Sequence, residues 1–406
     1  MRGETHSASR TSNLTHIVLS VTAIAGLVLF ILACRPSWSP DGRKVVYSYW
    51  DDKAKESAVV VFDRKTRTSR LLLEWWDKTS SDQTYPSPQW TKDGERILVT
   101  TYENKGTQLL ALPVNAKNPV RTYTLDKLTE PFLPYVQLGN TLFAMGESGI
   151  VRLDLETREL LERKVEHADD CLLYEAGNRV MYMRSVERES KESPEKKGSQ
   201  GENKKPAENL PSSYELGEVD QKDLSFSSMV TLKSQELEAR KLVDLTAMQD
   251  VEPRSLKFAA AEDSDKTKAP RIVVIGKSGI EQVLEVGIKE KPYALMNLQW
   301  SRDGGTIFAG AEIKDEKTKR SEFGVIEVPV DGKSIRIDRI QEGPTDEVEA
   351  GFISLSPDGK LIAVTTGLKK ETSAEKRGLF LLDVGKAERP VSFYPAPPLP
   401  KVAKEK

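Results

Sequence analysis

The sequence predicts an all-β protein: a β-propeller of seven four-stranded blades that follows an N-terminal hydrophobic anchor helix. Three observations support this prediction. A short turn motif recurs along the chain of 406 residues, an apolar segment with the composition of a strand follows each copy, and the spacing of the copies suits one propeller blade.

The turn motif is clearest in four places. Its copies read WSPDG, WTKDG, WSRDG and LSPDG, and begin at Trp38, Trp90, Trp300 and Leu355. In each copy an apolar residue ends one strand, and the Asp-Gly pair supplies the positive φ that a tight hairpin needs. Trp90 lies 52 residues after Trp38, and Leu355 lies 55 residues after Trp300. A repeat of this length with several short strands is typical of propeller blades.

Weaker copies fill the gaps between the clear ones. They are found around residues 138–143, 174–182 and 256–260. A segment with the composition of a third strand follows in every unit, at 59–63, 109–112, 150–154, 229–232, 272–275, 324–328 and 379–383. The pattern therefore predicts seven blades. Six blades are the alternative, if the weak unit near Leu256 merges with its neighbour.

The turn, the apolar strand after it and the aspartate at the end of the third strand resemble the WD-like repeats of TolB-type β-propellers. The resemblance covers residues 35–396 and implies the propeller fold. In that class the repeat residues build the fold and form no catalytic signature, so the resemblance implies no active-site residue and no cofactor. We expect an inserted segment at about 188–213, which is polar and lacks aromatic residues, to be disordered. Residues 397–406 form a polar C-terminal tail.

Residues 1–34 are predicted to be a signal peptide or a membrane anchor. The stretch from His16 to Cys34 has no charged residue, and its length lies between that of a secretory core and a spanning helix. Its end, Ile31-Leu32-Ala33-Cys34, resembles a bacterial lipobox, which implies lipidation of Cys34. A lipoprotein, an uncleaved signal anchor and a simple cleaved signal peptide remain open.

The anchor predicts a cell-envelope location, with the propeller facing the periplasm or the exterior. Since no Gly/Ser linker separates Cys34 from the first repeat, we expect the propeller to lie close to the membrane. The formal net charge of −2 offers no basic excess for nucleic acid. We therefore expect a monomer that contacts the membrane through its N-terminal lipid or helix and binds an unknown protein or peptide.

Catalytic chemistry finds little support in the sequence. His6 and His16 lie in the targeting segment, so His167 is the one histidine of the predicted propeller. The chain has no Gly-x-Ser-x-Gly motif, and Gly276-Lys277-Ser278-Gly279 has the composition of a hairpin turn. We expect no metal and no cofactor.

The loops between blades are expected to meet around one mouth of the central channel. They carry aromatic and acidic residues, a combination that suits a binding site. The candidate partner-binding residues are Tyr85, Tyr135, Asp170, Glu252, Tyr293 and Glu349. The alternative role of the aromatic residues is to cap the blades. The sequence thus predicts a non-catalytic, membrane-tethered binding scaffold outside the cytoplasm. The alternative is a propeller enzyme that uses channel-lining carboxylates on a peptide or glycan.

Overall fold

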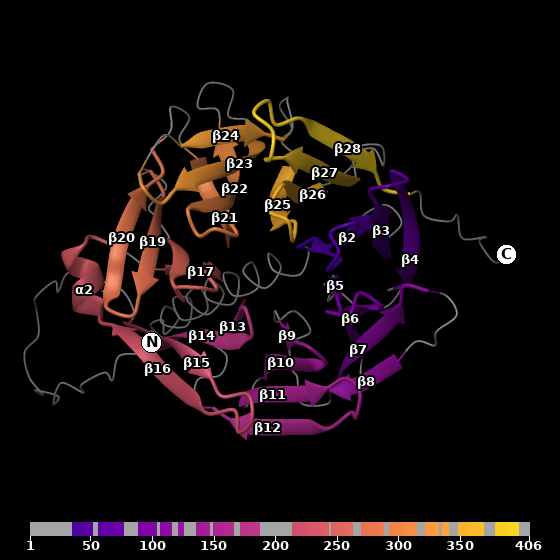
Figure 1. The fold of residues 1–406 in the computed structure, drawn as a ribbon, viewed down its shortest axis with the longest axis horizontal. Helices are drawn as coiled ribbons and strands as arrows, with labels where there is room; N and C mark the ends of the chain where they lie inside the picture. Colours follow the sequence, from indigo (N-terminus) through magenta and orange to yellow (C-terminus); the bar gives the residue numbers. More distant parts are fainter. Residues whose placement is uncertain are drawn as a thin grey trace, which may run out of the picture.

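The computed structural model folds into seven four-stranded antiparallel sheets arranged around a central axis (Figure 1). The structure describes residues 35–51, 56–76, 88–103, 106–115, 121–125, 135–146, 149–165, 171–186, 213–242, 245–262, 269–287, 292–314, 321–332, 335–340, 348–368 and 378–397. The prediction of seven blades is confirmed, and the six-blade alternative is wrong. The anchor segment 1–34, with Cys34, and residues 398–406 lie outside the described residues.

Each blade consists of four consecutive strands. The first three blades are β1 (Ser37–Trp38), β2 (Lys44–Asp51), β3 (Glu56–Asp63) and β4 (Thr68–Trp76); β5 (Pro88–Trp90), β6 (Arg96–Glu103), β7 (Gly106–Pro113) and β8 (Arg121–Leu125); and β9 (Val136–Leu138), β10 (Thr141–Gly146), β11 (Gly149–Asp154) and β12 (Leu160–Lys164). The innermost strand comes first in each blade, and the outermost strand comes last.

The remaining four blades follow the same order. They are β13 (Cys171–Ala176), β14 (Arg179–Val186), β15 (Ser213–Val219) and β16 (Phe226–Leu232); β17 (Leu245–Val251), β18 (Phe258–Glu262), β19 (Arg271–Gly276) and β20 (Gly279–Glu285); β21 (Pro292–Trp300), β22 (Thr306–Lys314), β23 (Ser321–Pro329) and β24 (Arg336–Arg339); and β25 (Val348–Leu355), β26 (Leu361–Leu368), β27 (Gly378–Asp383) and β28 (Val391–Pro395).

The fourth blade differs from the sequence prediction in one respect. The segment expected as its third strand, 229–232, belongs to the fourth strand, β16, and the third strand is β15. The segment expected to be disordered, 188–213, lies outside the described residues up to 212, and Ser213 begins β15. The short helix α2 (Ser234–Ala239) connects this blade to the next one. No helix in the described ranges has the length and hydropathy needed to cross a membrane.

The apolar core lies between the blades. One cluster of buried apolar side chains fills each of the seven interfaces between neighbouring sheets. The middle strands are apolar on both faces because each sheet is covered on both sides, as in β19, where Ile272 and Ile275 pack against opposite neighbours. Hydrophobic burial on this scale supplies most of the stability.

The recurring turn is held by the same side-chain contacts in each clear copy. In the first copy, the Ser39 hydroxyl donates to the Asp41 carboxylate at 2.7 Å and accepts the backbone N–H of Lys44 at 2.9 Å. The last copy repeats this arrangement with Ser356 and Asp358. The glycine that ends each motif has a positive φ, for example 72° at Gly359. The motif therefore fixes the hairpin between the first two strands of a blade.

Candidate functional site

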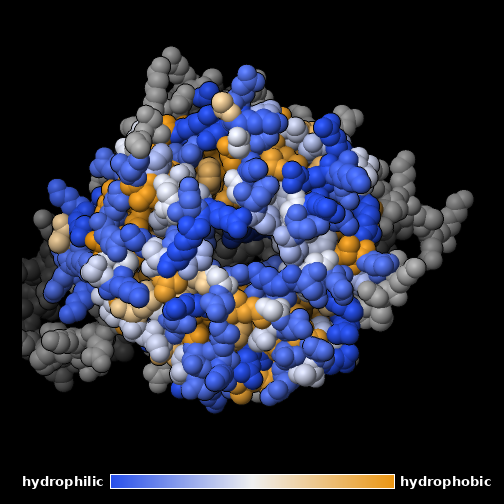
Figure 2. Space-filling view, viewed as in Figure 1, coloured by the Kyte–Doolittle hydropathy of each residue, from blue (hydrophilic) through white to orange (hydrophobic). Residues whose placement is uncertain are grey.

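The candidate site is a cavity on the propeller axis with a volume of about 460 Å³. The innermost strands of all seven blades contribute to its wall. The face shown in Figure 2 is largely hydrophilic and is hollowed near its centre. A cavity of this volume lies within the range of about 300–1,000 Å³ that is usual for ligand sites.

One residue of each blade occupies an equivalent place in the cavity wall. These residues pair with an equivalent position of the second strand, and in the four clear repeats they directly precede the first residue of the turn motif. In chain order they are Ser37, Gln89, Val136, Tyr174, Asp250, Gln299 and Ser354, and all of them line the cavity. We call this set the channel ring.

Hydrogen bonds between neighbouring blades hold the channel ring in place. Three ring side chains accept a backbone N–H from the next blade: Ser37 from Trp90 at 3.2 Å, Asp250 from Trp300 at 2.7 Å, and Gln299 from Leu355. Ser37, Asp250 and Gln299 thus have two functions. Each joins two adjacent blades through one side-chain atom and also lines the cavity.

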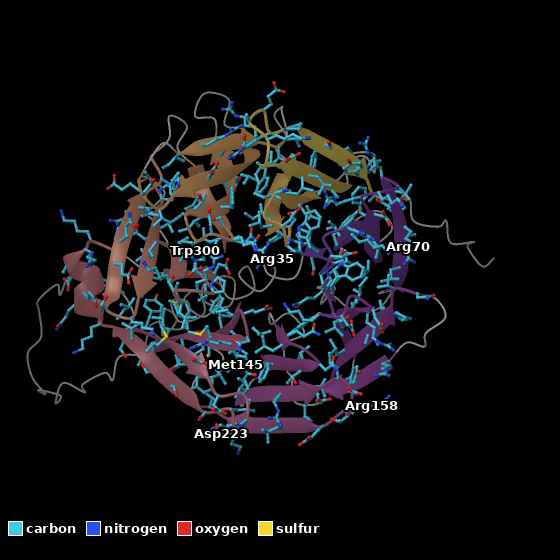
Figure 3. The ribbon with its side chains drawn as sticks, viewed as in Figure 1. Arg35, Arg70, Met145, Arg158, Asp223 and Trp300 are labelled. Carbon is cyan, nitrogen blue, oxygen red and sulfur yellow. The ribbon has the colours of Figure 1, made fainter. Side chains whose placement is uncertain are left out.

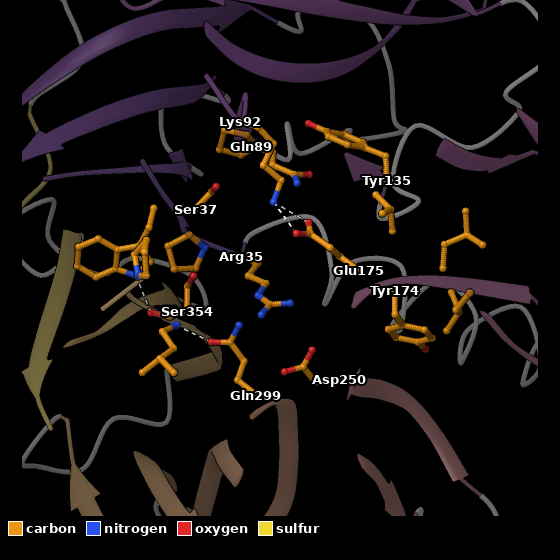
Figure 4. A pocket seen from close by; sticks show the side chains of 18 residues that line it. Arg35, Ser37, Gln89, Lys92, Tyr135, Tyr174, Glu175, Asp250, Gln299 and Ser354 are labelled. Carbon is orange, nitrogen blue, oxygen red and sulfur yellow. Dashed lines mark hydrogen bonds and ion pairs between the residues drawn. The ribbon is translucent and has the colours of Figure 1, made fainter. Parts of the chain in front are cut away.

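A pair of opposite charges faces the middle of the cavity. Arg35 precedes β1, and its side chain points toward Asp250 of β17 (Figure 4). Burial raises the pKa of Asp250 to about 6, although Arg35 and the backbone N–H of Trp300 oppose this shift. Burial likewise lowers the pKa of Arg35, against the opposing effect of Asp250. Each charge therefore stabilises the other in a poorly solvated environment.

A second charged pair lies at the end of the cavity near the recurring turns. The ammonium of Lys92 lies 2.6 Å from the carboxylate of Glu175 and joins the second blade to the fourth (Figure 4). Tyr174, next to Glu175, has a buried hydroxyl with no hydrogen-bond partner among the described residues. Burial raises the pKa of this phenol well above its ordinary value. Tyr174 is therefore neutral; its side chain lines the cavity, but its ring packs against Phe258 and its hydroxyl is shielded from solvent.

Two of the candidate binding residues have described side chains. Tyr135 lines the cavity, is buried, and donates its hydroxyl to the carbonyl oxygen of Leu98 at 3.2 Å. Glu252 is buried outside the cavity wall, where its carboxylate accepts hydrogen bonds from the backbone and hydroxyl of Ser255. Burial opposes ionisation of Glu252, but these hydrogen bonds outweigh it and lower its pKa. In the fifth blade Glu252 thus takes the place of the turn serine.

The other candidates are placed only in part. Tyr293 lies in β21 and Glu349 in β25, while their side chains are outside the described part of the structure. Tyr85 and Asp170 lie outside the described residues. Among the residues that the structure describes, no three His, Cys, Asp or Glu side chains lie close enough to hold a metal ion.

Most of the channel ring is not predicted from the sequence. Gln89, Gln299 and Ser354 directly precede the apolar residue that opens each turn motif, and this position could have been read as facing the axis. Arg35 was assigned only to the start of the propeller domain, and nothing in its local sequence indicates that its side chain lies in the channel.

The fold is shared with solved structures of low sequence identity. The β-propeller domain of the Trilobed protease from Pyrococcus furiosus, described as having an open velcro topology, is 12% identical with a TM-score of 0.50, over 89% of this chain and 98% of that one. A prolyl endopeptidase is 11% identical with a TM-score of 0.51, over 96% of this chain and 55% of that one. TolB from Acinetobacter baumannii is 14% identical with a TM-score of 0.37, over 77% and 54%.

The similarities to the Trilobed protease domain and to the prolyl endopeptidase show the β-propeller fold alone. The chain spans about half the length of the prolyl endopeptidase that it matches. No protein-family model matches the sequence, and no curated protein matches it.

Proposed function

We propose that this protein is a non-catalytic binding propeller, tethered to the outer side of a membrane by its N-terminal segment, and that the central channel is its binding site. The observation that carries this proposal is the channel ring. Every blade contributes one side chain to a single cavity of about 460 Å³, and hydrogen bonds between blades hold three of these side chains, Ser37, Asp250 and Gln299, in place. A preorganised, mostly polar wall suits the recognition of a peptide or a small ligand.

The enzyme alternative has less support from the described channel. A pair of carboxylates that acts on a glycan or a peptide needs one acid and one base free to reach the substrate. Glu175 is paired with Lys92, and Asp250 accepts the backbone N–H of Trp300 and faces Arg35. Both carboxylates are thus engaged within the wall.

A variant that fills the channel tests the proposal. Gln89→Trp places a large side chain in the ring at a position for which no described hydrogen bond is lost. Thr122→Trp makes a comparable change on the outer strand β8, where the residue is exposed. We expect partners that co-purify with the wild-type full chain from membranes to be lost with Gln89→Trp and kept with Thr122→Trp. Equal retention by both variants would contradict the channel as binding site.

Purified protein and its captured partner can be used to distinguish a binding protein from an enzyme. Purified full-length protein is incubated with the captured partner and with peptide and glycan mixtures, and the products are examined by mass spectrometry. We expect every substrate to remain intact. Cleavage that is present in the wild type and absent in Asp250→Asn would support the enzyme alternative.

A further inference from the structure

In the channel ring, the hydrogen bonds between blades occupy side-chain acceptor atoms. The donor groups of the same side chains remain available to a ligand in the cavity. The Ser37 hydroxyl oxygen and the Gln299 side-chain oxygen each accept a backbone N–H of the next blade. The Ser37 O–H and the Gln299 amide NH₂ are therefore available to donate (Figure 4). This assignment is forced by chemistry, since a backbone N–H can bond only to the acceptor end of an amide side chain.

One further donor group lies in the same wall. Arg35 presents a guanidinium with five N–H donors, stays charged, and extends toward the axis of the propeller (Figure 3). Near Arg35 the wall thus presents the donors of Arg35, Gln299 and Ser37, against the carboxylate of Asp250.

From this imbalance we propose that the channel binds a carboxylate group of its ligand, with Arg35 as the main contact and Gln299 and Ser37 as additional donors. The inference rests on the proposed function of the channel and names the chemical class that it recognises. A carboxylate matches the planar guanidinium in shape and charge, and charge-assisted hydrogen bonds of this kind are stronger than neutral ones.

Asp250 makes this binding dependent on protonation. The groups that face Asp250 in the described structure are Arg35, the backbone N–H groups of Trp300 and Val251, and Tyr174 and Glu175 from β13. Glu175 is neutralised by Lys92. When Asp250 is ionised, it competes with a ligand carboxylate for Arg35 and repels it. Since the pKa of Asp250 is about 6, the ligand should bind more tightly as the pH falls through this value.

The test measures how tightly three short peptides bind to the full chain in detergent micelles. Each peptide is titrated with the protein, and its affinity is determined from the NMR signals of the peptide. N-acetyl-trialanine carries a terminal carboxylate, its C-terminal amide carries no charge, and N-acetyl-Ala-Asp-Ala amide carries a side-chain carboxylate. We expect the charged peptides to bind about tenfold more tightly at about pH 5.5 than at about pH 7.5, and the amide to bind weakly at both. The difference between the two charged peptides identifies the source of the carboxylate.

Three variants assign the effect to residues. Arg35→Gln should lose about tenfold or more in affinity for the charged peptides, while Arg70→Gln, on the outer strand β4, should bind like the wild type (Figure 3). Asp250→Asn should bind at about pH 7.5 as tightly as the wild type at about pH 5.5, without pH dependence. Circular dichroism checks the fold of each variant.

Two kinds of result would overturn the inference. If the acid and the amide bind equally, the channel remains a binding site but does not select a carboxylate. If no peptide binds, or if Arg35→Gln and Arg70→Gln behave alike, Arg35 has no role in carboxylate recognition. The capture experiment with Gln89→Trp is independent of all these outcomes, so the failure of the proposed function is recognised separately.

Discussion

The indole N–H of Trp38 donates a hydrogen bond to the backbone oxygen of Ser354 at 2.8 Å, across 316 residues of sequence. Trp38 lies in the first blade and Ser354 in the last, and each of these blades consists of its own four consecutive strands. No strand is exchanged between the two ends of the described propeller. The ring is therefore closed by side-chain packing between these blades and by this hydrogen bond.

Removing this hydrogen bond should weaken the closure. We expect Trp38→Phe to lower the free energy of unfolding by about 1 kcal/mol more than Trp90→Phe does. Both changes remove the same volume from equivalent turn motifs, but the buried Trp90 indole N–H has no hydrogen-bond partner among the described residues. Denaturant unfolding of the two variants measures the difference. Equal losses of stability would show that the hydrogen bond does not contribute to closure.

The turn at Gly359 should not tolerate a β-branched residue. Its φ is 72°, and a Cβ at this position would meet the nearest atom, of Arg302, at 3.8 Å, so space is sufficient and only the backbone conformation opposes a side chain. We expect Gly359→Val to lower the free energy of unfolding by about 1–3 kcal/mol, and Gly359→Asn to cost less because asparagine tolerates this conformation better. Thermal and denaturant unfolding check this order.

The partly buried carboxylate of Asp250 in the channel wall should make stability depend on pH. Its pKa is about 6 in the folded protein, above the ordinary value of about 3.9, so the folded state binds the proton more tightly. The contribution of Asp250 to the free energy of unfolding is therefore largest below about pH 4 and falls by roughly 3 kcal/mol as the pH rises past 6.

The free energies of unfolding of the wild type and Asp250→Asn, compared at each pH, isolate this effect from the other carboxylates. We expect the wild type to lose stability relative to the variant between about pH 4 and 7. In Arg35→Gln the fall should extend to higher pH, because the opposing effect of the guanidinium is removed. A difference that is constant with pH, or of the opposite sign, would contradict a raised pKa of Asp250.

The predicted N-terminal anchor gives a fourth testable outcome. We expect Cys34→Ser to block acylation and to leave an unprocessed precursor, because the lipobox-like segment supplies no other thiol. Metabolic labelling with a fatty acid should mark the wild type and Cys171→Ser, whose thiol is buried between the third and fourth blades. An unlabelled wild type that stays in the membrane would favour the uncleaved signal anchor.

The sequence was sufficient to predict the blades because their turns have strict local requirements. An Asp-Gly pair with an adjacent hydroxyl residue is visible in a short stretch and fixes a hairpin of one kind. The third strand of the fourth blade was misplaced because apolar composition alone does not separate a third strand from a fourth. The long segment between β14 and β15 also interrupts the regular spacing between the strands of this blade, so the position of its third strand could not be inferred from the repeat length.

The channel could not be predicted in the same way. The ring position is occupied by serine, glutamine, valine, tyrosine and aspartate in different blades, so no residue type repeats there. The contacts that orient these side chains join residues about one blade apart, such as Ser37 and Trp90. Glu252 was expected at the channel mouth, but its carboxylate stabilises a turn, because a weak copy of the motif lacks the usual serine and aspartate.

Photo-crosslinking from inside the channel tests most directly whether the channel is the binding site. A photoreactive phenylalanine analogue is placed at Gln89 in the channel ring or, as the matched control, at Thr122 on the outer strand β8. Membranes with the full chain are irradiated, and the crosslinked species are identified by mass spectrometry. We predict crosslinks to a partner or ligand from position 89 and none from position 122. Crosslinks from position 122 alone would contradict the channel as the binding site.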